Sequence, residues 1–108
     1  MSMRIVFVLC LMLALARIAP AQTASAGKDL FTAKCAMCHG ADGSANTTMG
    51  KSFKIRNFHS PDVQKQSDAQ LTVIITKGKG NMPSFDGKLT TDQISQLVAY
   101  IRELGKQK

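Results

Sequence analysis

The chain has 108 residues, 44% of them hydrophobic, and a formal net charge of +7. This length allows one domain and excludes a multidomain protein. The lysines are scattered from Lys28 to Lys108 without a dense run or interleaved aromatic residues, which argues against nucleic acid as a partner.

The first 21 residues have the pattern of a secretory signal peptide. Arg4 precedes an uncharged run, residues 5–16, which is shorter than the roughly 20 residues that a transmembrane helix needs. Ala19-Pro20-Ala21 fits the small-x-small motif of a cleavage site, and Ala24-Ser25-Ala26 is a second candidate. An uncleaved N-terminal anchor is the alternative. We therefore predict a cleaved signal peptide over residues 1–21 and a mature domain over residues 22–108, exported to the periplasm.

The mature domain is predicted to begin with a helix that leads into a pair of cysteines. Residues 22–27 are small and polar, which is typical of an irregular N-terminus. Leu30, Phe31 and Lys34 follow with the spacing of a short amphipathic helix, which we expect over residues 26–38.

A long loop is expected next, because glycine and asparagine interrupt every hydrophobic period over residues 40–61. Loops of about 20 residues are unusual in compact domains unless they enclose something. A mature domain this small also has a marginal hydrophobic core and usually carries a covalent or metal-based staple. A covalently held cofactor would meet both requirements.

Two helices with capping boxes complete the predicted fold. Ser67 and Gln70 have the spacing of a capping box, and the short helix that they begin is expected to end at Gly78. Thr90 and Gln93 repeat this pattern before a C-terminal helix with apolar residues at helical spacing up to Gly105. No alternating strand pattern occurs, so the predicted fold class is all-α with long loops.

Cys35-Ala-Met-Cys38-His39 is the C-x-x-C-H motif of covalent haem attachment. On a helical turn Cys35 and Cys38 lie on one side, where both thiols can form thioethers with haem vinyl groups, and His39 faces the iron from the same side. A structural zinc site would need four ligands, and only His59 and scattered carboxylates remain for it. A thioredoxin-like dithiol would need a βαβ context that this sequence lacks. The motif therefore predicts one covalent haem c.

Met82 is the best candidate for the second axial ligand. It lies between two predicted helices, and Pro83 biases it toward extended backbone. Met37 lies between the two cysteines and cannot reach the opposite haem face. Met49 and His59 are reserve ligands, and a packing role for Met82 stays open, because methionine often fills gaps in cores.

Together these residues resemble the class I c-type cytochromes, the small monohaem type. The resemblance covers nearly all of residues 22–108 and implies the cytochrome c fold, in which the N- and C-terminal helices cross and long loops surround one covalent haem. In that family a small residue and an aromatic residue of the first helix pack on the last helix, and Gly27, Phe31, Leu97 and Tyr100 stand at matching positions.

The loop around the second ligand also matches, because Met82-Pro83 corresponds to the family's Met-Pro pair. One position departs from the family pattern. Many members have a proline roughly a dozen residues after the haem histidine, whose carbonyl accepts the imidazole N–H, and Lys51 stands at that distance here. The hydrogen-bond acceptor of His39 is therefore left unassigned. Lys54 and Arg56 are candidates to bind the haem propionates or to face solvent.

The resemblance implies a soluble single-electron carrier with axial ligands His39 and Met82, and not an enzyme. We expect a monomer without a membrane span after signal cleavage, whose lysines orient it on acidic surfaces of periplasmic redox partners. One alternative is a haem catalyst or gas-binding protein with an open sixth coordination site. Another is an interaction domain without haem.

Overall fold

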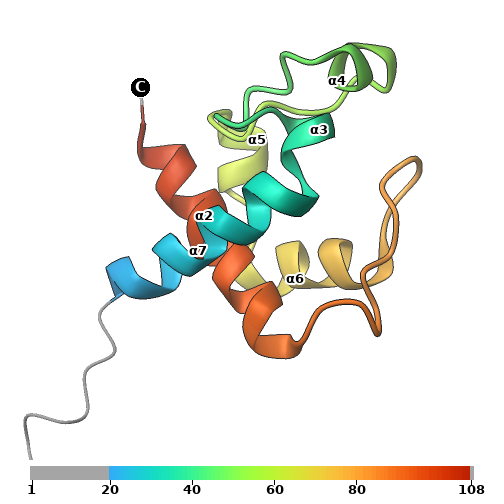
Figure 1. Cartoon of the computed structure of the whole chain (residues 1–108). Helices are drawn as coiled ribbons and strands as arrows, with labels where there is room; N and C mark the ends of the chain where they lie inside the picture. Colours follow the sequence, from blue (N-terminus) through green and yellow to red (C-terminus); the bar gives the residue numbers. More distant parts are fainter. Residues whose placement is uncertain (1–19, 108) are drawn as a thin grey trace, which may run out of the picture.

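The computed structural model describes residues 20–107, so most of the predicted signal peptide lies outside the described residues. Within that range helices and irregular loops form the structure, which confirms the all-α prediction (Figure 1). The single pairing of strand type there is an isolated bridge between Lys79 and Met82. None of the described helices is both long and apolar enough to span a bilayer. The helices are α2 (Pro20–Lys34), α3 (Ala36–His39), α4 (Thr48–Ser52), α5 (Pro61–Gln64), α6 (Asp68–Lys77) and α7 (Thr91–Lys106).

α7 begins at the predicted capping box and forms the centre of the core. The Thr90 hydroxyl accepts a hydrogen bond from the backbone N–H of Gln93, and the Gln93 side chain accepts one from the backbone N–H of Thr90. These bonds satisfy donors that every helix start leaves unpaired. One face of α7 is buried along its length and contributes Ile94, Leu97, Val98, Tyr100, Ile101 and Leu104 to the core.

α2 crosses α7 at a glycine, as predicted (Figure 1). A Cβ atom on Gly27 would lie 2.0 Å from the backbone oxygen of Gln96, so no other residue fits this close approach. One turn later Phe31 is only 1% exposed, and its ring meets that of Tyr100 edge-on at 5.2 Å between centroids. Such aromatic pairs contribute about 0.5–1.5 kcal/mol beyond their buried area.

The predicted boundaries of the first helix were wrong at both ends. We expected residues 22–27 to be irregular, but α2 already includes them and Ala24 is buried. Thr23, Ser25 and Gly27 are weak helix formers, so the helix depends on the packing of this segment. At the other end α2 stops at Lys34, Cys35 forms a turn, and α3 starts at Ala36.

The segment predicted as one long loop contains α4. Thr47 caps this helix: its hydroxyl accepts a hydrogen bond from the backbone N–H of Gly50 at 2.8 Å and donates one to the carbonyl of Cys38 at 2.6 Å. Gly50 is required by space, because a Cβ atom there would lie 2.1 Å from the carbonyl oxygen of Ala45. α4 is thereby held against the cysteine motif.

Arg102 of α7 connects the C-terminal helix to the start of α6. Its guanidinium donates hydrogen bonds to the carboxylate of Asp68 at 2.9 Å and to the backbone carbonyls of Gln64 and Gln66. Ser67 and Gln70 then form the predicted capping box, and α6 ends before Gly78, as expected. These hydrogen bonds from one half-buried side chain thus fix the position at which α6 starts.

We predict that Gly27→Ala destabilises the protein by about 1–3 kcal/mol, the usual cost of overpacking, although alanine is the better helix former. The new methyl group would force α2 away from the backbone of Gln96. Chemical denaturation of the purified protein measures this change. Ser25→Ala, an exposed position two residues earlier, is the control and should change the free energy of unfolding by less than about 0.5 kcal/mol. Equal stability of the two variants would contradict a tight helix crossing.

Candidate haem site

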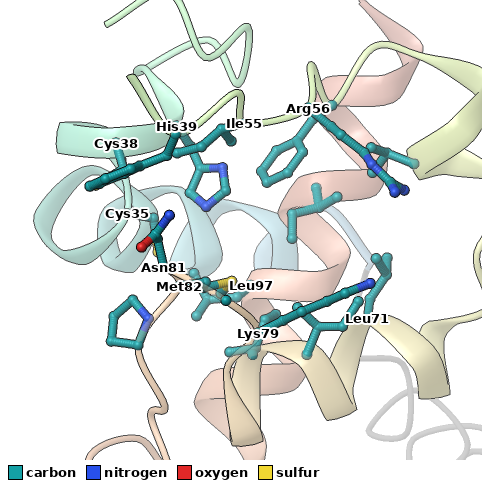
Figure 2. Close-up of a pocket in the computed structure, with 18 of the residues that line it drawn as sticks. Cys35, Cys38, His39, Ile55, Arg56, Leu71, Lys79, Asn81, Met82 and Leu97 are labelled. Carbon is teal, nitrogen blue, oxygen red and sulfur yellow. The ribbon is translucent and has the colours of Figure 1, made fainter. Parts of the chain in front are cut away.

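A cavity of about 430 Å³ opens between the cysteine motif and the segment around Met82 (Figure 2). This volume is within the roughly 300–1,000 Å³ range of small-molecule and cofactor sites. Its apolar walls come from α5, α6 and α7 and from the segment that follows α4. They include Phe53, Ile55, Phe58, Val63, Leu71, Ile74, Ile75, Leu97 and Ile101. The cavity is therefore a large apolar space in a small domain.

The two cysteines lie on one side of this cavity with free thiols. The backbone N–H groups of Cys38 and His39 both donate to the carbonyl of Cys35, which forms the predicted helical turn. Burial, and secondarily the neighbouring Cys38, raise the pKa of Cys35 to about 11. A reactive dithiol of the thioredoxin type has a lowered thiol pKa instead. The site is thus chemically unlike a dithiol oxidoreductase.

His39 projects into the cavity from the same wall as the cysteines (Figure 2). Its ring stacks on Phe58 with 4.6 Å between centroids. Burial lowers the pKa of His39, so the imidazole is neutral near pH 7, the form that coordinates metals.

The buried Nδ1 atom of His39 has no hydrogen-bond partner among the described residues. In the sequence, Lys51 stands where many family members have the proline whose carbonyl accepts this N–H. No carbonyl group of the described residues takes its place. Such an unpartnered buried nitrogen is rare in folded proteins.

Met82 faces His39 from the opposite wall, and the two side chains point toward each other across the cavity (Figure 2). A tight two-residue turn holds it: the backbone groups of Lys79 and Met82 exchange both hydrogen bonds, at 3.1 and 2.9 Å. Gly78 precedes this turn with φ +75°, and a Cβ atom there would lie 2.6 Å from the backbone oxygen of Met82. The position of Met82 therefore depends on the glycine.

The structure brings Cys35, Cys38, His39 and Met82 together on one cavity and leaves the reserve ligands outside it. Met49 is 38% exposed and does not line the cavity. His59 is half-buried, and its ring nitrogens face the backbone oxygens of Asp42 and Gln107.

The chain offers no structural zinc site in residues 20–107, because no three histidine, cysteine or acidic side chains cluster there. The four-ligand alternative to haem therefore lacks the side chains that it needs within this range.

Sequence reasoning missed part of the cavity wall. Leu71, Ile75 and Leu97 belong to the hydrophobic core, and they also line the cavity. Lys79 was not selected at all, although it lies three residues before Met82 and also lines the cavity. The proximity of a basic residue to the predicted ligand was the one signal that could have indicated it.

The chain matches a family described as cytochrome c oxidase, cbb3-type, subunit III, over residues 22–101. It is 36% identical over 78 residues to cytochrome c6 of Leptolyngbya boryana, and the match covers 72% of this chain and 88% of that protein. With cytochrome c6 of Rippkaea orientalis it shares 37% identity over 82 residues, which cover 72% of this chain and 68% of the relative.

A longer protein and a solved structure match as well. The cbb3-type cytochrome c oxidase subunit FixP of Azorhizobium caulinodans is 32% identical over 90 residues, but this chain covers only 30% of its length. The solved structure named KustC0563 c-type cytochrome has a TM-score of 0.69 and 33% identity, and covers 74% of this chain and 98% of its own.

We predict that Gly78→Ala displaces Met82 and weakens its bond to haem iron. The absorption spectrum of the ferric haem protein gives the readout, because methionine ligation produces a weak far-red band. Gly80→Ala is the control: Gly80 also has a positive φ, +58°, but nothing lies within 4 Å of its Cβ position. We expect most of the band to disappear in the Gly78 variant and to remain in the Gly80 variant. An unchanged band in both variants would show that Met82 does not depend on this contact.

Proposed function

This chain belongs to the class I c-type cytochromes, and we propose that its cavity holds the haem between His39 and Met82, with thioether bonds to Cys35 and Cys38. The chain carries one covalent haem c and acts as an electron carrier, as its family does. The observation that carries the ligand assignment is the opposition of His39 and Met82 across one cavity beside the two cysteines.

The proposed site transfers single electrons without changing its ligands. Bound haem supplies an iron that takes up and releases one electron. His39 and Met82 would hold the iron from opposite sides, which would keep substrates from the metal, and the apolar walls would limit the access of water. The turn at Lys79 and Met82 holds the thioether in place by backbone hydrogen bonds. These features favour a carrier over a haem catalyst or gas-binding protein.

The proposed partners are redox proteins with acidic docking surfaces. All charged residues that line the cavity are basic, and no aspartate or glutamate lines it; they are Lys34, Lys54, Arg56 and Lys79. A positive rim attracts and orients an acidic surface. We propose that the carrier acts as a monomer in the periplasm.

Met82→Ala tests the ligand assignment and the carrier function. We expect the variant to retain its haem and lose the far-red ferric band, because the thioether is removed. Its reduced form should bind carbon monoxide rapidly at neutral pH, whereas the wild type should not. Met49→Ala is the matched control, since Met49 is exposed and outside the cavity.

If the wild type lacks the far-red band and binds carbon monoxide rapidly, the sixth coordination site is open. The haem-catalyst or gas-binding alternative would then replace the carrier. A colourless exported protein would instead favour the interaction domain without haem.

We also propose cleavage of the signal peptide after Ala21 and not after Ala26. Ala24 is buried in α2, and Gly27 forms the contact with α7, so the later cut would remove the turn that precedes the crossing. Intact-mass measurement of the exported haem protein should give the mass of residues 22–108 plus one haem. The mass of residues 27–108 plus haem would contradict the proposal.

A further inference from the structure

The ring of Phe58 lies flat against the imidazole of His39. The two ring planes differ by 28°, and their centroids are 4.6 Å apart. Both side chains line the cavity, and Phe58 comes from the segment between α4 and α5. Rings stacked at this distance attract each other, and rotation of one ring out of the stack would lose that contact. Phe58 is therefore placed to set the plane of the imidazole.

Hydrogen bonding within residues 20–107 does not set this plane. The Nδ1 atom of His39 is buried and has no partner among these residues. Histidines that bind metals usually have their ring orientation fixed by a hydrogen bond from the second ring nitrogen. Of the two phenylalanine rings near this imidazole, Phe31 lies farther away, at 6.3 Å and a tilt of 43°. The stack on Phe58 is thus the contact that acts on the face of the ring.

The backbone of Phe58 is held at both of its polar groups. Its N–H donates to the carbonyl of Gly43 at 2.8 Å, and its carbonyl accepts a hydrogen bond from the side-chain amide of Gln64 at 2.6 Å. A Cβ atom on Gly43, which has φ +73°, would lie 3.2 Å from the ring of Phe58. The ring therefore projects from a fixed backbone that packs closely on the loop after His39.

His59, the next residue, adds two further contacts to this segment. Its Nε2 atom lies 2.8 Å from the backbone oxygen of Asp42, and its Nδ1 atom lies 3.2 Å from that of Gln107. The first contact joins the segment to the loop after His39, and the second joins it to the end of α7. Both neighbours of the loop thus limit the movement of Phe58.

A row of aromatic rings also links His39 to the crossing of α2 and α7. The centroid of Phe58 is 6.1 Å from that of Phe31, and the ring of Phe31 meets that of Tyr100 at 5.2 Å. Phe31 and Tyr100 are buried. Because packed interiors contain few voids, one ring of such a row moves only when its neighbours shift. The side chain of Phe58 is therefore held as firmly as its backbone.

We infer that Phe58 is a positioning residue for the haem iron, because its ring sets the plane of the His39 imidazole. This inference rests on the proposed function, in which His39 is an axial ligand. The plane of an axial imidazole decides which iron d orbitals it overlaps. A plane that stays the same in both oxidation states reduces the rearrangement that accompanies electron transfer.

The test compares the ferric haem-loaded protein with three variants: Phe58→Leu, Phe58→Tyr and Ile94→Ala. Leucine keeps an apolar side chain but removes the flat ring, whereas tyrosine retains the ring. Ile94 is buried in the core and does not line the cavity, so Ile94→Ala loosens the core without removing a contact of His39. The readout is the electron paramagnetic resonance spectrum of the low-spin iron, whose g values depend on the plane of the axial imidazole.

We expect Phe58→Leu to shift the g values and broaden the signals, because the imidazole then occupies a different and wider range of planes. Phe58→Tyr and Ile94→Ala should keep the g values of the wild type. If Phe58→Leu does not fold, Phe58→Met gives the same comparison, since a flexible methionine fills irregular space without a flat ring.

Wild-type g values in the folded leucine or methionine variant would overturn the inference. An equal shift in Ile94→Ala would also overturn it, since general loosening of the core would then be the cause. The far-red ferric band separates these results from a failure of the proposed function. If the wild type shows this band, the carrier stands and only the role of Phe58 is rejected. If the wild type lacks it, the Met82 ligation itself is rejected.

Discussion

The crossing of α2 over α7 is the contact on which the rest of the structure depends. Gly27 lets the two backbones approach, and Phe31 and Tyr100 close the contact one turn further along. Only Cys35 separates the end of α2 from α3, so the orientation of α2 sets the direction in which the cysteine motif faces. A shift at the crossing would move both thiols and the imidazole as one unit. Packing far from the cavity thus determines the geometry inside it.

The opposite wall of the cavity, which carries Met82, is positioned by contacts at the two ends of α6. Arg102 fixes its start through Asp68 and two backbone carbonyls, and Gly78 allows the chain to turn sharply back at its end. The apolar cavity between the two walls is too large for a domain of this size to leave empty without cost. A covalently attached haem would complete the core as well as supply the redox centre, which couples folding to cofactor attachment.

The sequence predicted the elements whose signals are local. Both capping boxes, the glycine after α6 and the C-x-x-C-H turn are each recognisable within five residues, and the structure contains all of them. Features that depend on distant partners were missed. The helical start of α2 follows from burial of Ala24, and α4 follows from the bond between Thr47 and the Cys38 carbonyl. Lys79 lines the cavity because of the turn between Lys79 and Met82. Neither hydrophobic periodicity nor helix propensity predicts such a turn.

Three features of the proposed site each favour ferrous over ferric iron and so raise its reduction potential. A thioether ligand favours ferrous iron more than a second imidazole would. The Nδ1 atom of His39 has no acceptor within residues 20–107, and a hydrogen bond there would have raised the basicity of the ligand and stabilised the ferric state. Arg56 and Lys79 add positive charge beside the cavity. Because none of these three contributions opposes the others, the site should hold its electron more firmly than a relative whose axial histidine is bonded to a carbonyl. Such a carrier accepts electrons readily and passes them only to partners of higher potential.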